Sequence, residues 1–405
     1  MASTSNWRSD LAFSARLSEV TRITTAFQSC NPSVSAVEAG TAAVAIETKK
    51  YDEAQSLADY ERKCREKIEE LLQRALTQVK LEKEDDAVPL PSPTGIDIGT
   101  YKNAVYHREG LYSVVYRATA LDDSHGNYFS PGTPPRSRLV ALKVTTPPVM
   151  QPPHDSRREA KILESSKSDH IIPLLDTFRQ DGDHFVLVFP FMAFDLHQML
   201  QDQLVSKHQA KHYLRDLLSG LVFIHSHNII HRDIKPSNIL IKSVDGPAYL
   251  SDFGIAWSPS TSGTERADSK ITDVGTTCYR PPELLFGNKQ YGCSLDLWAA
   301  GCTVAEVVVP GHPTLFDSGE LGSDLALIQS MFSKLGTPNL TVWPEAANLP
   351  DWGKMQFREY PPQPWHALLP GAIDLDVGLV SELVKYESGA RMTAAKALEH
   401  PYFVQ

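Results

Sequence analysis

Three short motifs in the second half of the chain constrain what it can fold into more than any other feature. They are HRDIKPSN at residues 231–238, DFG at residues 252–254 and GTTCYRPPE at residues 275–283. A strand-like segment that contains Ala141 and Lys143 precedes all three. A single aspartate or lysine in a loop is usually a solvated surface charge, and any one triplet could occur by chance. The complete set in this order exceeds coincidence, so we interpret it as one functional constellation.

The pattern around these motifs changes from strand-like to helix-like along the chain. Strands are predicted at residues 114–116, 139–144 and 184–189. A helix is predicted at residues 157–165, and helical patterns dominate beyond residue 195. This order predicts an α+β fold of two lobes with a cleft between them. The small β-rich lobe covers about 96–190 and the large α-helical lobe about 191–405.

Residues 1–95 are predicted to be an extension outside the two lobes. Residues 1–48 are rich in Ser, Thr and Ala and show no clear register, which predicts partial disorder. An amphipathic helix is predicted near residues 51–83, with an apolar stripe of Leu57, Cys64, Ile68, Leu71, Leu72, Ala75 and Val79. The proline-rich residues 89–93 end it and place a domain boundary near residue 95. We expect the stripe to pack on the lobes that follow, with a partner helix as the alternative.

Composition excludes several classes of protein. The net charge of −10 over 405 residues argues against a nucleic-acid binder, because phosphate contacts need a basic surface. The five scattered cysteines indicate reduced thiols, without a disulfide framework or a zinc site. No segment reaches the roughly 18 apolar residues of a membrane span. The N-terminus faintly resembles a mitochondrial transit peptide, but Asp10 and Glu19 argue against one. We expect an intracellular protein of the nucleus, the cytoplasm or both.

The motif set resembles the catalytic loop, the metal-binding turn and the end of the activation segment in protein kinases. The resemblance covers roughly residues 96–405. It implies an enzyme that uses ATP and Mg²⁺ to phosphorylate Ser or Thr of protein substrates. Lys235, two residues after Asp233, distinguishes this loop from the tyrosine-kinase version. Phosphoryl transfer requires mostly positioning and charge neutralisation, which accounts for the residue types.

The resemblance assigns a role to each site residue. Catalytic roles fall on Asp233 as the base, Lys235 at the γ-phosphate, Lys143 at the α- and β-phosphates, Glu159 as the partner of Lys143, and Thr276. Asn238 and Asp252 would supply oxygen ligands to Mg²⁺. The nucleotide pocket would be lined by Gly110, Val115, Ala141, Lys143, Phe189, Met192, Asp195 and Leu240.

The phosphate loop is the weakest match to the family. It aligns with residues 108–115, where only Gly110 remains of three glycines. Glycines let backbone N–H groups approach phosphate and let the loop bend. We expect Arg108 and Ser113 to stiffen the loop and to slow nucleotide exchange. The scaffold matches are stronger: Glu283 with Arg391 would form a buried ion pair, and Asp296 would brace the catalytic loop.

Within protein kinases, the chain resembles the cyclin-dependent kinase branch of the CMGC group. The matching segments are FMAFDL at 191–196, YRPPELL at 279–285, LGTPN at 335–339 and AAKALEHPYF at 394–403. Arg280 matches the arginine that shapes the pocket for the residue after the phosphoacceptor. Gly275 lies where that pocket needs an unusual backbone angle, which glycine tolerates.

Three departures from this branch concern activation. The sequence HDSRR at 154–158 replaces the helix that binds cyclin. Arg158 and Arg232 match two of the three arginines that grip the activating phosphate, but the third position is Trp257. Ile271 occupies the usual phosphothreonine position, with Thr272 adjacent. The pattern resembles the single-subunit fungal kinases that activate cyclin-dependent kinases, and it predicts weak dependence on cyclin and on phosphorylation.

Two other interpretations remain at this stage. One is a conventional cyclin-bound, proline-directed kinase that is phosphorylated on Thr272. The other is a pseudokinase scaffold, which the eroded phosphate loop favours and the intact Lys143, Asp233 and Asp252 oppose.

Overall fold

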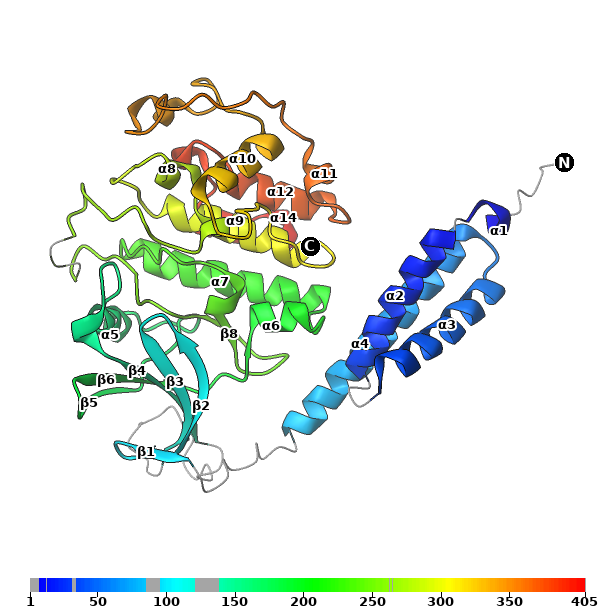
Figure 1. The fold of residues 1–405 in the computed structure, drawn as a ribbon, viewed down its shortest axis with the longest axis horizontal. Helices are drawn as coiled ribbons and strands as arrows, with labels where there is room; N and C mark the ends of the chain where they lie inside the picture. Colours follow the sequence, from blue (N-terminus) through cyan, green and yellow to red (C-terminus); the bar gives the residue numbers. More distant parts are fainter. Residues whose placement is uncertain are drawn as a thin grey trace. The chain divides into compact units, whose positions relative to one another are not determined.

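The computed structural model describes residues 7–11, 13–30, 34–84, 95–120, 138–261, 263 and 265–404. The chain divides into an N-terminal helical unit and a larger unit that contains the sheet and most of the later helices (Figure 1). The predicted proline-rich break at 89–93 and the loop between the strands near 114 and 139 lie outside the described residues.

The N-terminal unit is a bundle of three long helices preceded by a short one (Figure 1). Its helices are α1 (Trp7–Asp10), α2 (Phe13–Cys30), α3 (Ala36–Glu53) and α4 (Leu57–Glu84). The sequence predicted one helix near 51–83, whereas the structure ends α3 at Glu53 and starts α4 at Leu57. The Ser56 hydroxyl accepts the N–H of Asp59 at 3.2 Å, a local hydrogen bond that caps the new helix. Helices α2 and α3 were not predicted.

The apolar stripe of α4 packs inside this unit, which corrects the expectation that it packs on the lobes. Ile68 and Leu71 share a buried cluster with Ile23, Ala26 and Ala43 of α2 and α3. Small alanines at the contacts let helices approach closely, but they give little amphipathic contrast, so the two helices show no clear register. Of the stripe, Leu57 is 40% exposed, and the side chains of Leu72, Ala75 and Val79 lie outside what the structure describes.

A buried polar cluster joins the three long helices. Glu47 of α3 is 2% exposed and receives Arg16 of α2 at 2.6 Å and the hydroxyl of Tyr60 of α4 at 2.8 Å. The Arg16 guanidinium lies 3.9 Å from the centre of the Tyr51 ring. Because a buried carboxylate needs all its partners, this cluster fixes the rotation of each helix about its axis.

The small lobe of the larger unit is a six-stranded antiparallel sheet in the order β1-β2-β3-β4-β6-β5. The strands are β1 (Ile96–Ile98), β2 (Tyr101–Gly110), β3 (Ser113–Thr119), β4 (Leu139–Thr145), β5 (Asp176–Gln180) and β6 (His184–Pro190). Val140 and Leu142 of β4 and Val186 and Val188 of β6 form its core by alternation. The three predicted strands are confirmed as β3, β4 and β6.

Helix α5 (Ser156–Ser165) confirms the helix predicted at 157–165 and carries charged residues inward. The Asp155 carboxylate accepts the N–H groups of Arg157 and Arg158, both at 3.0 Å, and so caps the helix. Arg158 and Glu159 are 7% and 1% exposed. The cap therefore sets the register that aims two consecutive charged residues at the interior.

The large lobe is mostly helical, as predicted. Its elements are β7 (Phe194–Asp195), α6 (Leu196–Gln201), α7 (Lys207–Ser226), β8 (Ile239–Ile241), β9 (Ala248–Leu250), α8 (Pro282–Leu285), α9 (Ser294–Val308), α10 (Asp324–Leu335), α11 (Trp365–Leu368), α12 (Asp374–Leu383), α13 (Ala394–Leu398) and α14 (Pro401–Val404). Helix α9 is buried from Leu295 to Val307, and among the described helices none is apolar over a length that could cross a bilayer.

Both predicted scaffold interactions are confirmed. Glu283 of α8 and Arg391 form a bidentate ion pair with two contacts of 2.6 Å, and both side chains are buried. Asp296 of α9 is fully buried and accepts the backbone N–H groups of His231 and Arg232, each at 2.9 Å. Buried charges of this kind persist only when they are fully hydrogen-bonded, so both pairs fix loops onto the helical core.

We predict that a chain lacking residues 1–90 remains folded and active. The N-terminal bundle has its own core, and all motif residues lie in the other unit. Thermal unfolding and peptide phosphorylation of the shortened chain should resemble those of the full chain. Insolubility or loss of activity would mean that the bundle supports the kinase lobes.

Candidate active site

A cavity of about 480 Å³ contains most of the residues expected to bind nucleotide and metal. It is formed by β2, β3, β4 and β6 on one side and by β7, β8 and the DFG turn on the other. Its lining includes Gly110, Val115, Ala141, Lys143, Glu159, Phe189, Met192, Asp195, Lys235, Asn238, Leu240 and Asp252. The volume suits a nucleotide-sized ligand. Asp233 and Thr276 lie next to it, in the loops described below.

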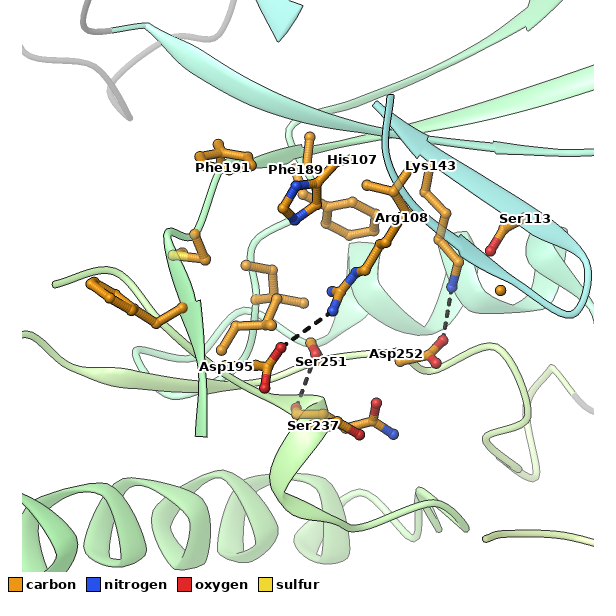
Figure 2. A pocket seen from close by; sticks show the side chains of 18 of the residues that line it. His107, Arg108, Ser113, Lys143, Phe189, Phe191, Asp195, Ser237, Ser251 and Asp252 are labelled. Carbon is orange, nitrogen blue, oxygen red and sulfur yellow. Dashed lines mark hydrogen bonds and ion pairs between the residues drawn. The ribbon is translucent and has the colours of Figure 1, made fainter. Parts of the chain in front are cut away.

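Lys143 of β4 is held by two carboxylates. Its Nζ lies 2.7 and 2.9 Å from the two carboxylate oxygens of Glu159 on α5. It also lies 2.8 Å from Oδ1 of Asp252 (Figure 2). Glu159 is buried, whereas the side chain of Asp252 is 49% exposed towards the cavity. The geometry therefore brings the predicted lysine, its helix partner and the predicted metal ligand to one point.

The electrostatics of this trio favour the charged forms of Lys143 and Asp252, whereas burial raises the pKa of Glu159. The Lys143 ammonium holds the pKa of the Asp252 carboxyl well below its usual range. Burial alone would lower the pKa of Lys143, but Asp252 and Glu159 outweigh it and raise that pKa. A cation is thus maintained in the cavity, where it would meet phosphate oxygens.

The catalytic loop gathers three predicted residues around Asp233. Oδ1 of Asp233 accepts the N–H of Thr276 at 2.9 Å and its hydroxyl at 2.8 Å. Nζ of Lys235 lies 2.8 Å from Oδ2 of Asp233 and 2.7 Å from the Thr276 hydroxyl. A carboxylate, an ammonium and a hydroxyl in mutual contact can orient a substrate hydroxyl and neutralise a phosphate next to it.

The two predicted metal ligands fit Mg²⁺ by their donor chemistry. The Asn238 side chain donates its NH₂ group to the Asp233 carbonyl oxygen at 2.8 Å and to Oδ2 of Asp233 at 3.0 Å, which leaves its amide oxygen as the ligand atom. The other ligand, the ionised Asp252 carboxylate, lines the same cavity. Asp252 has φ of +63°, an unusual angle that turns its side chain into the cavity. Two hard oxygen donors suit a cation that completes its shell with phosphate and water.

The phosphate loop is a hairpin whose strands are paired up to its tip. Gly110 pairs with Ser113, Glu109 with Val114 and Arg108 with Val115, which leaves a two-residue turn. The ring of Tyr112 in this turn lies 4.9 Å from that of His154, just before α5. Pairing to the tip and an anchored turn replace the freedom that the missing glycines would have given.

Sequence reasoning missed His107 at the cavity mouth and the contact that Arg108 makes there. The Arg108 guanidinium reaches from β2 towards the Asp195 carboxylate, 3.6 Å away (Figure 2). His107 packs edge-on against Phe191, with ring centres 5.2 Å apart. A shift in the strand pairing between Tyr106 and Arg108 accompanies the presence of both consecutive residues in the cavity lining. Such a shift leaves no signal in the sequence.

The end of the activation segment has the backbone expected of it. Gly275 has φ of +78°, and a Cβ there would lie 2.6 Å from the carbonyl oxygen of Arg232. Arg280 donates its Nε to the Gly275 carbonyl at 3.0 Å. Trp257, at the third arginine position, is 6% exposed and pairs by its backbone with Ile230. Glycine is therefore required at 275 by both angle and space.

A β-rich lobe, a helical lobe and a cleft with this charged constellation define a protein kinase. The family model of the protein kinase domain matches residues 132–403, and the chain belongs to the protein kinase family. It is a serine/threonine kinase of the cyclin-dependent kinase-like type within the CMGC group.

Several curated relatives support this assignment. Serine/threonine-protein kinase csk1 of Schizosaccharomyces pombe is 40% identical over 258 residues, 62% of this chain and 82% of that protein. Cyclin-dependent kinase D-1 of Oryza sativa subsp. japonica is 40% identical over 301 residues, 73% of this chain and 65% of the rice protein. Human cyclin-dependent kinase 20 is 35% identical over 286 residues, 70% of this chain and 80% of the human protein.

A second family model, that of the KIX domain, matches residues 4–80. The match coincides with the bundle of α2, α3 and α4, so this segment is similar to a known domain rather than to a single appended helix. Sequence patterning did not indicate this domain, because the first two long helices lack a clear apolar register.

We predict that Asp252→Asn lowers turnover about a hundredfold or more, because it removes one charged Mg²⁺ ligand needed in the transition state. The fold should persist, since Lys143 keeps Glu159 as a partner. Peptide phosphorylation and thermal unfolding would be measured together. Turnover near that of the unmodified enzyme would contradict the metal assignment.

A second prediction separates contact with nucleotide from orientation of the lysine. Lys143→Met should lower kcat/KM about a hundredfold, and Glu159→Gln should lower it less, because Glu159 acts only through Lys143. Lys161→Met is the matched control, an exposed lysine on α5. Equal activity of Lys143→Met and the control would mean that another lysine binds the phosphates.

Proposed function

We propose that this kinase transfers the γ-phosphoryl group of ATP to Ser or Thr in the activation segments of cyclin-dependent kinases, and that it does so as a single chain without cyclin. The observation that carries the proposal is the assembled pair of Lys143 and Glu159, with Nζ 2.7 Å from the carboxylate. Both partners of this pair belong to the same chain, so no residue of a cyclin takes part in it. The replaced cyclin-binding sequence at 154–158 and the similarity to fission yeast csk1 support it.

The residues divide the chemistry among them. Lys143 would hold the α- and β-phosphates, and Asn238 and Asp252 would hold Mg²⁺, which neutralises phosphate charge when bound. Asp233 would take the proton of the substrate hydroxyl as that oxygen bonds to the γ-phosphorus, while the bond from the γ-phosphorus to the bridging oxygen breaks and ADP leaves. Lys235, 2.8 Å from Asp233, would balance the charge on the transferred group. Thr276 orients both residues through its hydroxyl and its N–H.

The environment of Trp257 supports activity without a phosphate on the segment. The indole is buried in a cluster with Ile230, Val274 and Tyr291, and its Nε1 donates to the backbone carbonyl of Glu265 at 3.0 Å. The Lys270 ammonium lies 4.7 Å from the centre of the indole ring. A buried aromatic of this size contributes extensive apolar contact, so it would fix the segment by packing.

We predict that phosphatase-treated protein made in bacteria phosphorylates activation-segment peptides of cyclin-dependent kinases. Thr272→Ala should be nearly silent, because Arg232 binds Glu265 and Arg158 donates to the Pro153 carbonyl. Trp257→Ala should lower turnover, because it removes the packing around the segment. Turnover of the three proteins would be compared with and without added cyclin.

Two results would replace this proposal. Loss of activity after phosphatase or in Thr272→Ala would support a conventional kinase that needs phosphorylation, and activity only with cyclin would support a cyclin-bound one. ATP·Mg²⁺ binding without any turnover would support the pseudokinase.

A further inference from the structure

The strongest feature outside the active site is a buried charge cluster under the activation segment. Three acidic residues lie between the DFG turn and Gly275: Glu265, Asp268 and Asp273. Asp268 and Asp273 are solvent-exposed and pair with Arg266 and Arg280. The Glu265 side chain is only 7% exposed. Of these three carboxylates, that of Glu265 is therefore buried, whereas those of Asp268 and Asp273 face solvent.

Two buried guanidinium groups converge on Glu265. Arg232 of the catalytic loop, whose side chain is 0% exposed, forms a bidentate contact with both carboxylate oxygens. Arg158 of α5, 8% exposed, places Nη1 3.6 Å from Oε2. The N–H of Ile271 donates to Oε1 at 2.9 Å. Bidentate arginine–carboxylate contacts are among the strongest charged hydrogen bonds in proteins.

The remaining contacts of the two arginines are neutral. Arg232 also donates Nε to the Ile255 carbonyl at 2.5 Å and Nη1 to the Tyr291 hydroxyl at 3.0 Å, and Arg158 donates to the Pro153 carbonyl. These groups offer dipoles but no counter-charge. The pKa of Glu265 tends upward through burial, but Arg232, the Ile271 N–H and Arg158 outweigh this and hold it below its usual value. Glu265 is thus the anion that balances two buried cations.

The cluster connects the parts that must be aligned for phosphoryl transfer. Arg158 precedes Glu159, the partner of Lys143, and Arg232 precedes Asp233. Downstream of Ile271, the segment reaches Thr276, which contacts Asp233 and Lys235. The Glu265 carboxylate therefore contacts α5 through Arg158 and the catalytic loop through Arg232. Through the N–H of Ile271 it also holds the part of the segment that leads to Thr276.

We propose that Glu265 is a built-in positioning residue that occupies the pair Arg158 and Arg232 in place of an activating phosphate and so holds the activation segment in its substrate-accepting position. This deepens the proposed function and rests on kinase activity, but not on the identity of the substrate. No modification of the segment is then required, because the anion is part of the sequence.

The test compares Glu265→Gln, Glu265→Asp and the matched control Asp268→Asn, each phosphatase-treated, with a generic basic protein such as myelin basic protein as substrate. Glu265→Gln keeps the shape and removes the charge. We expect its kcat to fall about tenfold or more, because buried guanidiniums lose their counter-charge. Affinity for ATP should fall less than kcat, because Glu265 reaches the Lys143 site only indirectly, through α5. Asp268→Asn should stay within about twofold of the unmodified enzyme, as expected for an exposed pair.

Further readouts separate a charge effect from general damage. Glu265→Asp keeps the carboxylate and should retain more activity than Glu265→Gln. Trypsin should cut after Arg266 and Lys270 faster in Glu265→Gln than in the control. The double variant Arg158→Gln/Glu265→Gln should lose little more than Glu265→Gln alone, because the two residues share one interaction.

Two outcomes would overturn the inference. One is a kcat of Glu265→Gln equal to that of Asp268→Asn. The other, informative even if Glu265→Gln folds poorly, is a Glu265→Asp variant no more active than Glu265→Gln. If the unmodified enzyme is active on the basic protein but inactive on activation-segment peptides, the proposed substrate fails while the Glu265 comparison stands.

Discussion

The catalytic half of the molecule depends on one buried carboxylate, that of Asp296. It lies on α9, a helix otherwise surrounded by apolar side chains, and it accepts the N–H groups of His231 and Arg232. Arg232 has φ of +72°, a backbone angle that an arginine rarely adopts without compensation. The two hydrogen bonds supply that compensation. They fix Asp233 in place and also aim the Arg232 side chain at the activation segment.

Near this anchor, two short chains of ion pairs connect the two lobes. One chain runs from Arg232 through Glu265 to Arg158 on α5. The second chain runs from Glu159 through Lys143 to Asp252. Because Arg158 and Glu159 are consecutive, a shift of α5 would disturb both chains together. This coupling gives a physical reason why the state of the activation segment affects the nucleotide site.

The N-terminal bundle is held together by contacts of a different kind. Its three long helices are joined by small alanine contacts and by the buried contacts of Glu47 with Arg16 and Tyr60. A polar core of this type defines one arrangement of helices more sharply than apolar contacts alone. The similarity of residues 4–80 to the KIX domain agrees with a folded unit that has its own core.

The sequence by itself determined the kinase fold and the strands β3, β4 and β6. It also predicted the residues gathered at the cavity, because phosphoryl transfer permits few residue types and most of them lie in short motifs. Asp296 and the pair of Glu283 with Arg391 were predictable because they match scaffold positions of the family that the motifs resemble. Only the tertiary structure decided the contact of Arg108 with Asp195, the bundle of α2, α3 and α4, and the place of Glu265. Each of these joins residues on separate elements, or helices whose small side chains leave no periodic signal. Nothing local distinguishes Glu265 from Asp268; folding alone brings two arginines to one of them.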